Sequence, residues 1–101
     1  MYLLLVHYTQ PMDKVAALTA DHRAYLDRFY ATGELLLSGR RNPPSGGVLV
    51  GHFKDRATVE AFVAGDPFVT GGVGRYEIIE FAPAKRSPEV ETYLKRVGAE
   101  G

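Results

Sequence analysis

The stretch ELLLSGRRNPPSGGVLVGHF, residues 34–53, contains two short apolar runs separated by a cluster of turn-forming residues. The runs ELLLSGRR (34–41) and VLVGHF (48–53) have the length and composition of strands. The segment between them, NPPSGG (42–47), concentrates proline, serine and glycine, which are typical of turns. We therefore expect a β-hairpin with a long loop in the middle of the chain.

A strand and a helix precede this hairpin. YLLLVHY (2–8) is a short apolar run rich in strand formers, and it predicts the first strand. From Asp13 to Thr32, apolar residues recur at three- and four-residue steps, which is the spacing of one helix face, and Gly33 supplies the stop. The members of this stripe are Val15, Leu18, His22, Tyr25, Leu26 and Phe29.

A second helix and a fourth strand follow the hairpin. Asp55 can cap a helix over 56–65, which Gly65 ends. After a glycine-rich connection, YEIIEFA (76–82) predicts a strand. The order β-α-β-β-α-β is the ferredoxin-like pattern, an α+β fold in which helices cover one face of an antiparallel sheet.

A short helix closes the chain. Ser87 is a suitable N-cap, Pro88 suits the first turn, and Gly98 supplies the stop. We expect one domain, with its ferredoxin-like part at 1–82 and a C-terminal helical extension of the same domain at 83–101.

The strands do not alternate between apolar and polar residues, as a sheet with one wet face would require. In the first strand, Tyr2, Leu4 and Val6 point to one side, while Leu3 and Leu5 point to the other. The hairpin strands show the same two-sided pattern, with Leu35 and Leu37 against Leu36, and Val48 and Val50 against Leu49 and Phe53. Because both faces favour burial, we expect a homodimer that packs sheet against sheet.

Composition narrows the class of partner. The 101 residues carry 12 Lys and Arg against 12 Asp and Glu, so the formal net charge is zero. This balance argues against nucleic-acid or anionic-membrane partners, because both attract a basic excess. With no cysteine, the chain has no disulfide, thiolate metal site or cysteine nucleophile. The apolar run at residues 2–8 is too short to span a bilayer, and we expect a cytoplasmic protein.

His22 is the most informative single residue, because it lies within the apolar stripe of the first helix. It follows Leu18 by four positions and precedes Tyr25 by three. One interpretation is a core histidine satisfied by one hydrogen bond. The other is a histidine that faces a pocket under the helix and acts as a general base or acid.

Asp66 lies in GDPFVTGG, residues 65–72, between the second helix and the fourth strand. It can cap a helical turn that begins at Pro67, and this would need no further function. Pro67 also favours an extended Asp66, which directs the side chain. A catalytic histidine needs a carboxylate to orient it, so a contact between Asp66 and His22 is the alternative.

Other polar residues have the same two interpretations. Ser38 either bonds neighbouring backbone or bonds a ligand, and Arg40 and Arg41 are either edge-strand charges or attract an anionic substrate. The tyrosines, Tyr25 among them, either pack or line a pocket.

Neither a metal site nor a nucleotide site is indicated. His7 and His52 fall in the first and third expected strands, but no pair of histidines has the spacing of a metal-ligand motif. The segment SGG at 45–47 lacks the lysine and the flanking strand and helix of a phosphate loop. We therefore expect no metal and no cofactor.

Three motifs in this order resemble the YciI-like (YCII-related) family over residues 1–82. They are ADHRAYLDRFYATGELLLSG, GGVLVGHF and DPFVTGGVGRYEIIEF. The resemblance implies a dimeric α+β barrel and a pocket with a histidine–aspartate pair and a nearby serine, which correspond here to His22, Asp66 and Ser38. Arg40 departs from the family, where a proline or small uncharged residue is common. One activity reported in the family is dehydrochlorination of a chlorinated hydroquinone.

The residues and the resemblance together lead to a functional hypothesis. We expect an enzyme that transfers a proton in an isomerisation or elimination on a small cyclic or aromatic substrate. His22 would move the proton, and Asp66 would orient His22. Ser38 would donate a hydrogen bond to the substrate or to the histidine–aspartate pair. The expected substrate-binding residues are Arg40, Phe68 and Tyr25. The alternative is a dimeric metabolite-binding or accessory module without turnover.

Overall fold

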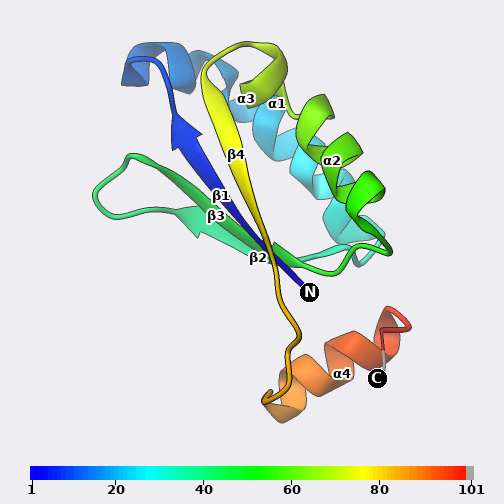
Figure 1. Cartoon of the computed structure of the whole chain (residues 1–101). Coiled ribbons are helices and arrows are strands. Elements are labelled where there is room, and N and C mark those ends of the chain that lie inside the picture. Colours follow the sequence, from blue (N-terminus) through cyan, green and yellow to red (C-terminus); the bar gives the residue numbers. More distant parts are fainter. Residues whose placement is uncertain (100–101) are drawn as a thin grey trace.

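The structure is a computed structural model that describes residues 1–99. Within these residues, four strands form one sheet, and the helices that follow β1 and β3 lie on one side of it (Figure 1). The elements are β1 (Tyr2–Tyr8), α1 (Met12–Ala31), β2 (Leu35–Arg40), β3 (Gly46–Gly51), α2 (Arg56–Gly65), α3 (Pro67–Thr70), β4 (Gly74–Glu80) and α4 (Pro88–Arg96).

The sheet has the strand order β2-β3-β1-β4, and every neighbouring pair is antiparallel. This is the ferredoxin-like arrangement, in which the first strand lies between the third and the fourth. The predicted α+β fold class is therefore confirmed, with one addition. A four-residue helix, α3, occupies the connection before β4.

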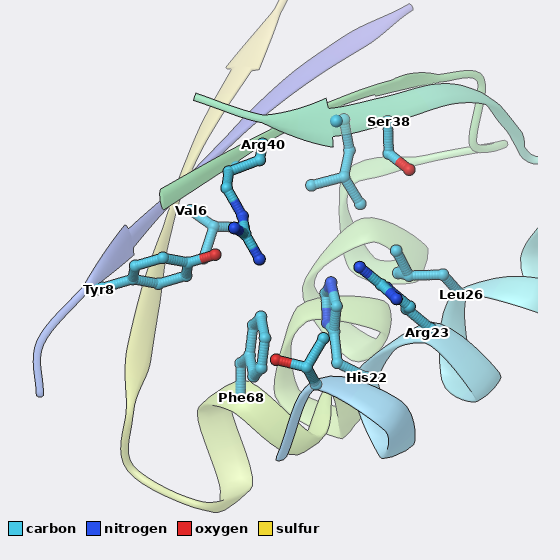
Figure 2. Close-up of a pocket in the computed structure, with 12 residues that line it drawn as sticks. Val6, Tyr8, His22, Arg23, Leu26, Ser38, Arg40 and Phe68 are labelled. Carbon is cyan, nitrogen blue, oxygen red and sulfur yellow. The ribbon is translucent and has the colours of Figure 1, made fainter. Parts of the chain in front are cut away.

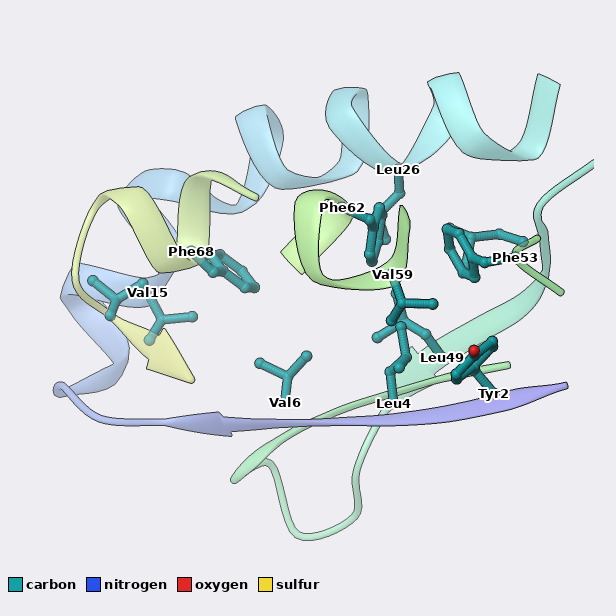
Figure 3. Packing of buried hydrophobic residues seen from close by; sticks show 12 residues of the cluster. Tyr2, Leu4, Val6, Val15, Leu26, Leu49, Phe53, Val59, Phe62 and Phe68 are labelled. Carbon is teal, nitrogen blue, oxygen red and sulfur yellow. The ribbon is translucent and has the colours of Figure 1, made fainter. Parts of the chain in front are cut away.

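The hydrophobic core lies between the sheet and α1 and α2 (Figure 3). Tyr2, Leu4 and Val6 point to this side from β1, as their alternation predicted, and each is at most 3% exposed. The helices contribute buried side chains at helical spacing. These are Val15 and Leu26 from α1, Val59 and Phe62 from α2, and Phe68 from α3.

The third strand begins two residues earlier than the sequence indicated. Its first residue, Gly46, pairs with His7, and a β-carbon at Gly46 would lie only 1.7 Å from the Val6 carbonyl oxygen. A glycine is thus the residue that permits the strands to approach here. His52 and Phe53, expected inside this strand, follow its end.

The predicted faces of the second strand are wrong at one position. Leu35 is 3% exposed whereas Leu37 is 54% exposed, so the two leucines do not share a face. The cause is a shift in the β2–β3 register between them. An extra residue in one strand reverses the side to which the following side chains point.

The tail helix α4 docks against the turn between α1 and β2. Ser87 caps it by accepting a hydrogen bond from the Val90 amide at 3.3 Å. The Tyr93 hydroxyl donates to the Gly33 carbonyl at 2.6 Å and accepts from the His52 amide at 3.2 Å. The last two residues of the expected extension lie outside the described part of the chain.

The face of the sheet that points away from α1, α2 and α3 carries an apolar surface beside the polar residues His7 and Glu77. Its exposed members are Leu37, Ile79 and Phe81, which lie 37% to 54% open, and half-buried neighbours fill the space between them. We call this surface the open sheet face; it comprises Leu3, Leu5, Leu37, Val48, Val50, Ile79 and Phe81. No helix within residues 1–99 has the length and hydropathy needed to cross a membrane.

Candidate active site

Asp66 occupies the junction between α2 and α3. Its backbone is extended (φ −67°, ψ 128°), as the following Pro67 favours, and its side chain accepts a hydrogen bond from the Phe68 amide at 3.0 Å. Asp66 therefore caps α3, as the local sequence suggested. It is also completely buried, which is rare for a carboxylate that lacks a partner.

The partner of this carboxylate is His22 on α1. Its Nδ1 lies 2.8 Å from Oδ1 and 3.0 Å from Oδ2 of Asp66. Because a carboxylate only accepts hydrogen bonds, the ring proton is assigned to Nδ1, and Nε2 carries the free lone pair of the neutral ring. Capping and the contact with His22 thus coexist, since the two carboxylate oxygens provide several acceptor positions.

A third side chain also reaches the carboxylate. The Tyr76 hydroxyl, from β4, donates a short hydrogen bond to Oδ2 of Asp66. Burial raises the pKa of Tyr76, and the neighbouring Asp66 charge raises it further. Tyr76 therefore stays neutral and keeps its proton for this bond.

Phe68 fixes the plane of the histidine ring. The two rings are stacked, with centroids 3.9 Å apart and planes within 7°. Phe68 is itself buried, and Tyr8 from β1 meets it edge-on at 5.9 Å. Stacking on one side and the carboxylate on one edge leave His22 little freedom to rotate.

His22 forms part of the wall of a cavity of about 240 Å³ between α1 and the sheet (Figure 2). Its side chain is 13% exposed, so the ring meets the cavity without being freely hydrated. The apolar lining comes from Val6, Leu26, Leu49 and Phe68. The polar lining comes from Tyr8, Thr19, Arg23, Ser38 and Arg40.

The structure brings most of the predicted site residues to this cavity. Ser38 and Arg40 line it from β2, and Ser38 Oγ accepts a hydrogen bond from the Tyr30 hydroxyl at 2.6 Å. Two predicted residues do not line the cavity. Asp66 is fully buried and is connected to the cavity through His22, and Tyr25 lies elsewhere. Its hydroxyl donates to the Phe62 carbonyl at 2.7 Å, and its ring packs among aromatic residues of the core.

Sequence reasoning missed Arg23 as part of this site, and it left Tyr8 and Tyr76 with two interpretations, packing or a place at a pocket. Arg23 follows His22 directly, but its position in the helix lies outside the apolar stripe. Tyr76 lies two positions before Ile78 in β4, so the alternation of that strand indicates that it points toward the helices. The cross-chain contact with Asp66 has no such local signal.

The two other histidines lie outside the cavity. His7 is on the opposite face of the sheet, where its Nε2 lies 3.2 Å from Glu77 and its Nδ1 lies 3.3 Å from Arg41. His52 lies near the far end of β1, and burial lowers the pKa of its imidazole. Among residues 1–99, no three His, Cys, Asp or Glu side chains gather as they would around a metal ion.

Comparison of the sequence with protein-family models shows the family of this chain. A sequence model of the YCII-related domain matches residues 1–82, which is most of the chain. The chain belongs to the YCII-related domain family. No curated protein matches the sequence of this YCII-related protein.

A solved structure with a similar fold is that of 5-chloro-2-hydroxyhydroquinone dehydrochlorinase from Burkholderia phenoliruptrix AC1100, in complex with 2,5-dihydroxybenzoquinone. The TM-score is 0.66, and the match covers 81% of this chain and 94% of the other. The sequences are 20% identical, and at this identity the structural similarity shows a shared fold alone.

Proposed function

We propose that this YCII-related protein is a small-molecule enzyme in which His22 transfers a proton. One observation carries the proposal. Nδ1 of His22 bonds the buried carboxylate of Asp66, and the same imidazole ring lines a cavity. A carboxylate on one ring nitrogen orients the imidazole and stabilises the imidazolium that forms when the other nitrogen accepts a proton. This is what a general base requires.

The proposed reaction is an isomerisation or an elimination of HX from a small cyclic or aromatic substrate. His22 Nε2 removes a proton from the substrate, and the electron pair of the broken bond forms a new double bond. In an elimination, X⁻ leaves with the electrons of its bond to carbon. In an isomerisation, the imidazolium returns the proton to another atom. Neither reaction needs a redox partner.

The remaining polar groups have supporting roles. Ser38 has a hydroxyl proton to offer a substrate oxygen, because its Oγ accepts the bond from Tyr30. The apolar part of the wall suits a ring, and the structural neighbour is named for its action on a hydroxylated, chlorinated ring. We therefore propose hydroxylated or halogenated ring compounds as the first substrates to try.

The test measures chloride release from 5-chloro-2-hydroxyhydroquinone and ring-proton exchange in a panel of hydroquinones. Replacing His22→Gln is expected to slow turnover about 10²–10⁴-fold, the usual contribution of a positioned proton-transfer group. Asp66→Asn is expected to slow it as well and to remove the downfield His22 Nδ1 proton signal from the NMR spectrum. His7→Gln is the matched control, since His7 lies on the other face of the sheet.

Turnover by the His22→Gln variant at the rate of the unmodified protein would contradict this mechanism. Ligand binding by the unmodified protein with no conversion of any panel member over hours would favour the alternative, a metabolite-binding or accessory module. Circular dichroism on each variant separates loss of function from loss of fold.

We also propose that the protein works as a homodimer that buries the open sheet face. An isolated apolar surface of this kind is uncommon in a stable monomer. A second copy offers the same surface, so a two-fold axis would cover both at once.

A further inference from the structure

Two arginines reach the cavity from opposite walls. Arg23 follows His22 on α1, and Arg40 ends β2, where it pairs with Gly47. In Figure 2, both guanidinium groups point into the space beside the His22 ring, one from the helix and one from the sheet. The glycine opposite Arg40 has no side chain to occupy that space. The cavity is therefore positively charged on two sides.

Within residues 1–99, no acidic side chain forms an ion pair with either arginine. The ion pairs found within residues 1–99 join His7 to Glu77, His22 to Asp66, Arg56 to Glu60 and Arg86 to Glu91. None of the residues that line the cavity is acidic. The oxygens of Asp66 are turned to His22, Phe68 and Tyr76. Two free guanidinium groups in a chain with zero net charge are a local concentration of charge that an anion would neutralise.

The rest of the lining restricts the shape of such an anion. Besides the arginines and His22, the lining combines aliphatic side chains and the buried ring of Phe68 with the hydroxyl groups of Tyr8, Thr19 and Ser38. An inorganic anion would leave this apolar surface without contacts. A planar ring with charged oxygens at its edges would cover the apolar wall and reach both guanidinium groups.

We propose that the cavity takes its substrate as a ring oxyanion, with one ionised oxygen held by Arg23 and another by Arg40. This inference rests on the proposed function, because it names the substrate class of the same site. We assign the two arginines to substrate binding. His22 lies between them, where it would face the ring of the bound substrate. A guanidinium offers paired donors to an oxyanion, and such charge-assisted bonds are stronger than neutral ones.

The test is a calorimetric titration of the full chain with 2,5-dihydroxybenzoquinone, which is ionised at neutral pH. Arg23→Gln and Arg40→Gln are each expected to weaken binding about tenfold or more. Arg28→Gln removes a charge from the same helix, and we expect a change below about twofold, because Arg28 does not line the cavity and would not contact the ligand. Arg23→Lys and Arg40→Lys keep the charge and are expected to recover part of the affinity.

Three further probes separate charge from ring. The uncharged 2,5-dimethoxybenzoquinone is expected to bind at least about tenfold more weakly than the ionised compound. Benzoate carries its charge at one edge only, and phosphate carries charge without a ring, so both are expected to bind more weakly as well. Wild-type affinity in both glutamine variants, equal affinity for the dimethoxy compound, equal affinity for benzoate or phosphate, or no binding of the ionised quinone would each overturn the inference.

The His22→Gln variant separates this inference from the proposed function. Intact binding with lost turnover supports both. Intact turnover in His22→Gln, together with weakened binding in the arginine variants, overturns the proton-transfer role and leaves the anion site standing.

Discussion

The histidine–aspartate pair is held by a tyrosine that the chemistry itself does not require. Asp66 is completely buried. Besides His22, the Phe68 amide donates a hydrogen bond to its Oδ1 and the Tyr76 hydroxyl donates one to its Oδ2. The Phe68 amide is part of the backbone and cannot be removed by substitution. The Tyr76 hydroxyl can be removed, which makes it the handle for testing how far the orientation of the carboxylate matters.

Replacing Tyr76→Phe is expected to destabilise the protein by about 1–3 kcal/mol, because a buried carboxylate loses a donor. We also expect turnover to fall about tenfold, since Asp66 would orient His22 less firmly. The pKa of Tyr76 is raised by burial and by Asp66, so ionisation of the unfolded chain above its ordinary pKa of about 10 removes stability in the unmodified protein. Urea unfolding at a series of alkaline pH values checks this. The free energy of unfolding should fall less steeply with pH in the variant than in the unmodified protein.

Tyr93→Phe is a suitable control for this substitution. It removes a buried tyrosine hydroxyl whose partners are the Gly33 carbonyl and the His52 amide, none of which lines the cavity, so we expect it to cost stability and to leave turnover unchanged. Equal stability and equal turnover in Tyr76→Phe and the unmodified protein would show that the tyrosine does not support the carboxylate.

At the scale of the elements, the pairing of β3 with its neighbours depends on a residue without a side chain at its first position. This strand pairs with β1 and β2, so it joins the hairpin to the centre of the sheet. Its first residue lies almost in contact with the β1 backbone, where a side chain has no room. The register of β3 therefore depends on a glycine that, in the sequence, resembles part of the loop.

Replacing Gly46→Ala is expected to lower the free energy of unfolding by about 3 kcal/mol, because its β-carbon would overlap the Val6 carbonyl. The matched control is Gly39→Ala in β2, where no atom lies within 4 Å of the added carbon. That change should stay within about 0.5 kcal/mol. Urea unfolding at fixed protein concentration compares them, and equal stabilities would mean that the strands can separate locally at little cost.

For the whole molecule, the main question is the open sheet face. The helices bury one side of the sheet, and α4 docks at its end without covering the other side. A charge placed at the centre of this face would lie inside the proposed interface, where desolvation makes it costly.

We expect the unmodified protein to sediment at twice the mass of the chain at micromolar concentration. Ile79→Glu should weaken the dimer by about tenfold or more, because it places a like charge from each copy in the interface. Met12→Glu changes a comparably exposed apolar residue at the start of α1 and should leave the dimer intact. A monomeric unmodified protein, or an Ile79→Glu dimer of full strength, would contradict the assembly.

The sequence by itself determined the order of elements and the sides of β1, because helical and strand periodicities are local. It also indicated His22, Ser38 and Asp66, through the apolar stripe and the resemblance to a family. It could not show the β2 bulge or the start of β3, since these depend on how closely neighbouring backbones approach.

Only the tertiary structure decided which polar groups meet. His22 and Asp66 are 44 residues apart, and Tyr76 comes from a third element, so their contact depends on the packing of α3 against α1 and β4. The same packing turned Tyr25 away from the cavity and brought Arg23 to its wall. Side-chain direction at a pocket depends on neighbours distant in the chain, and no local pattern records them.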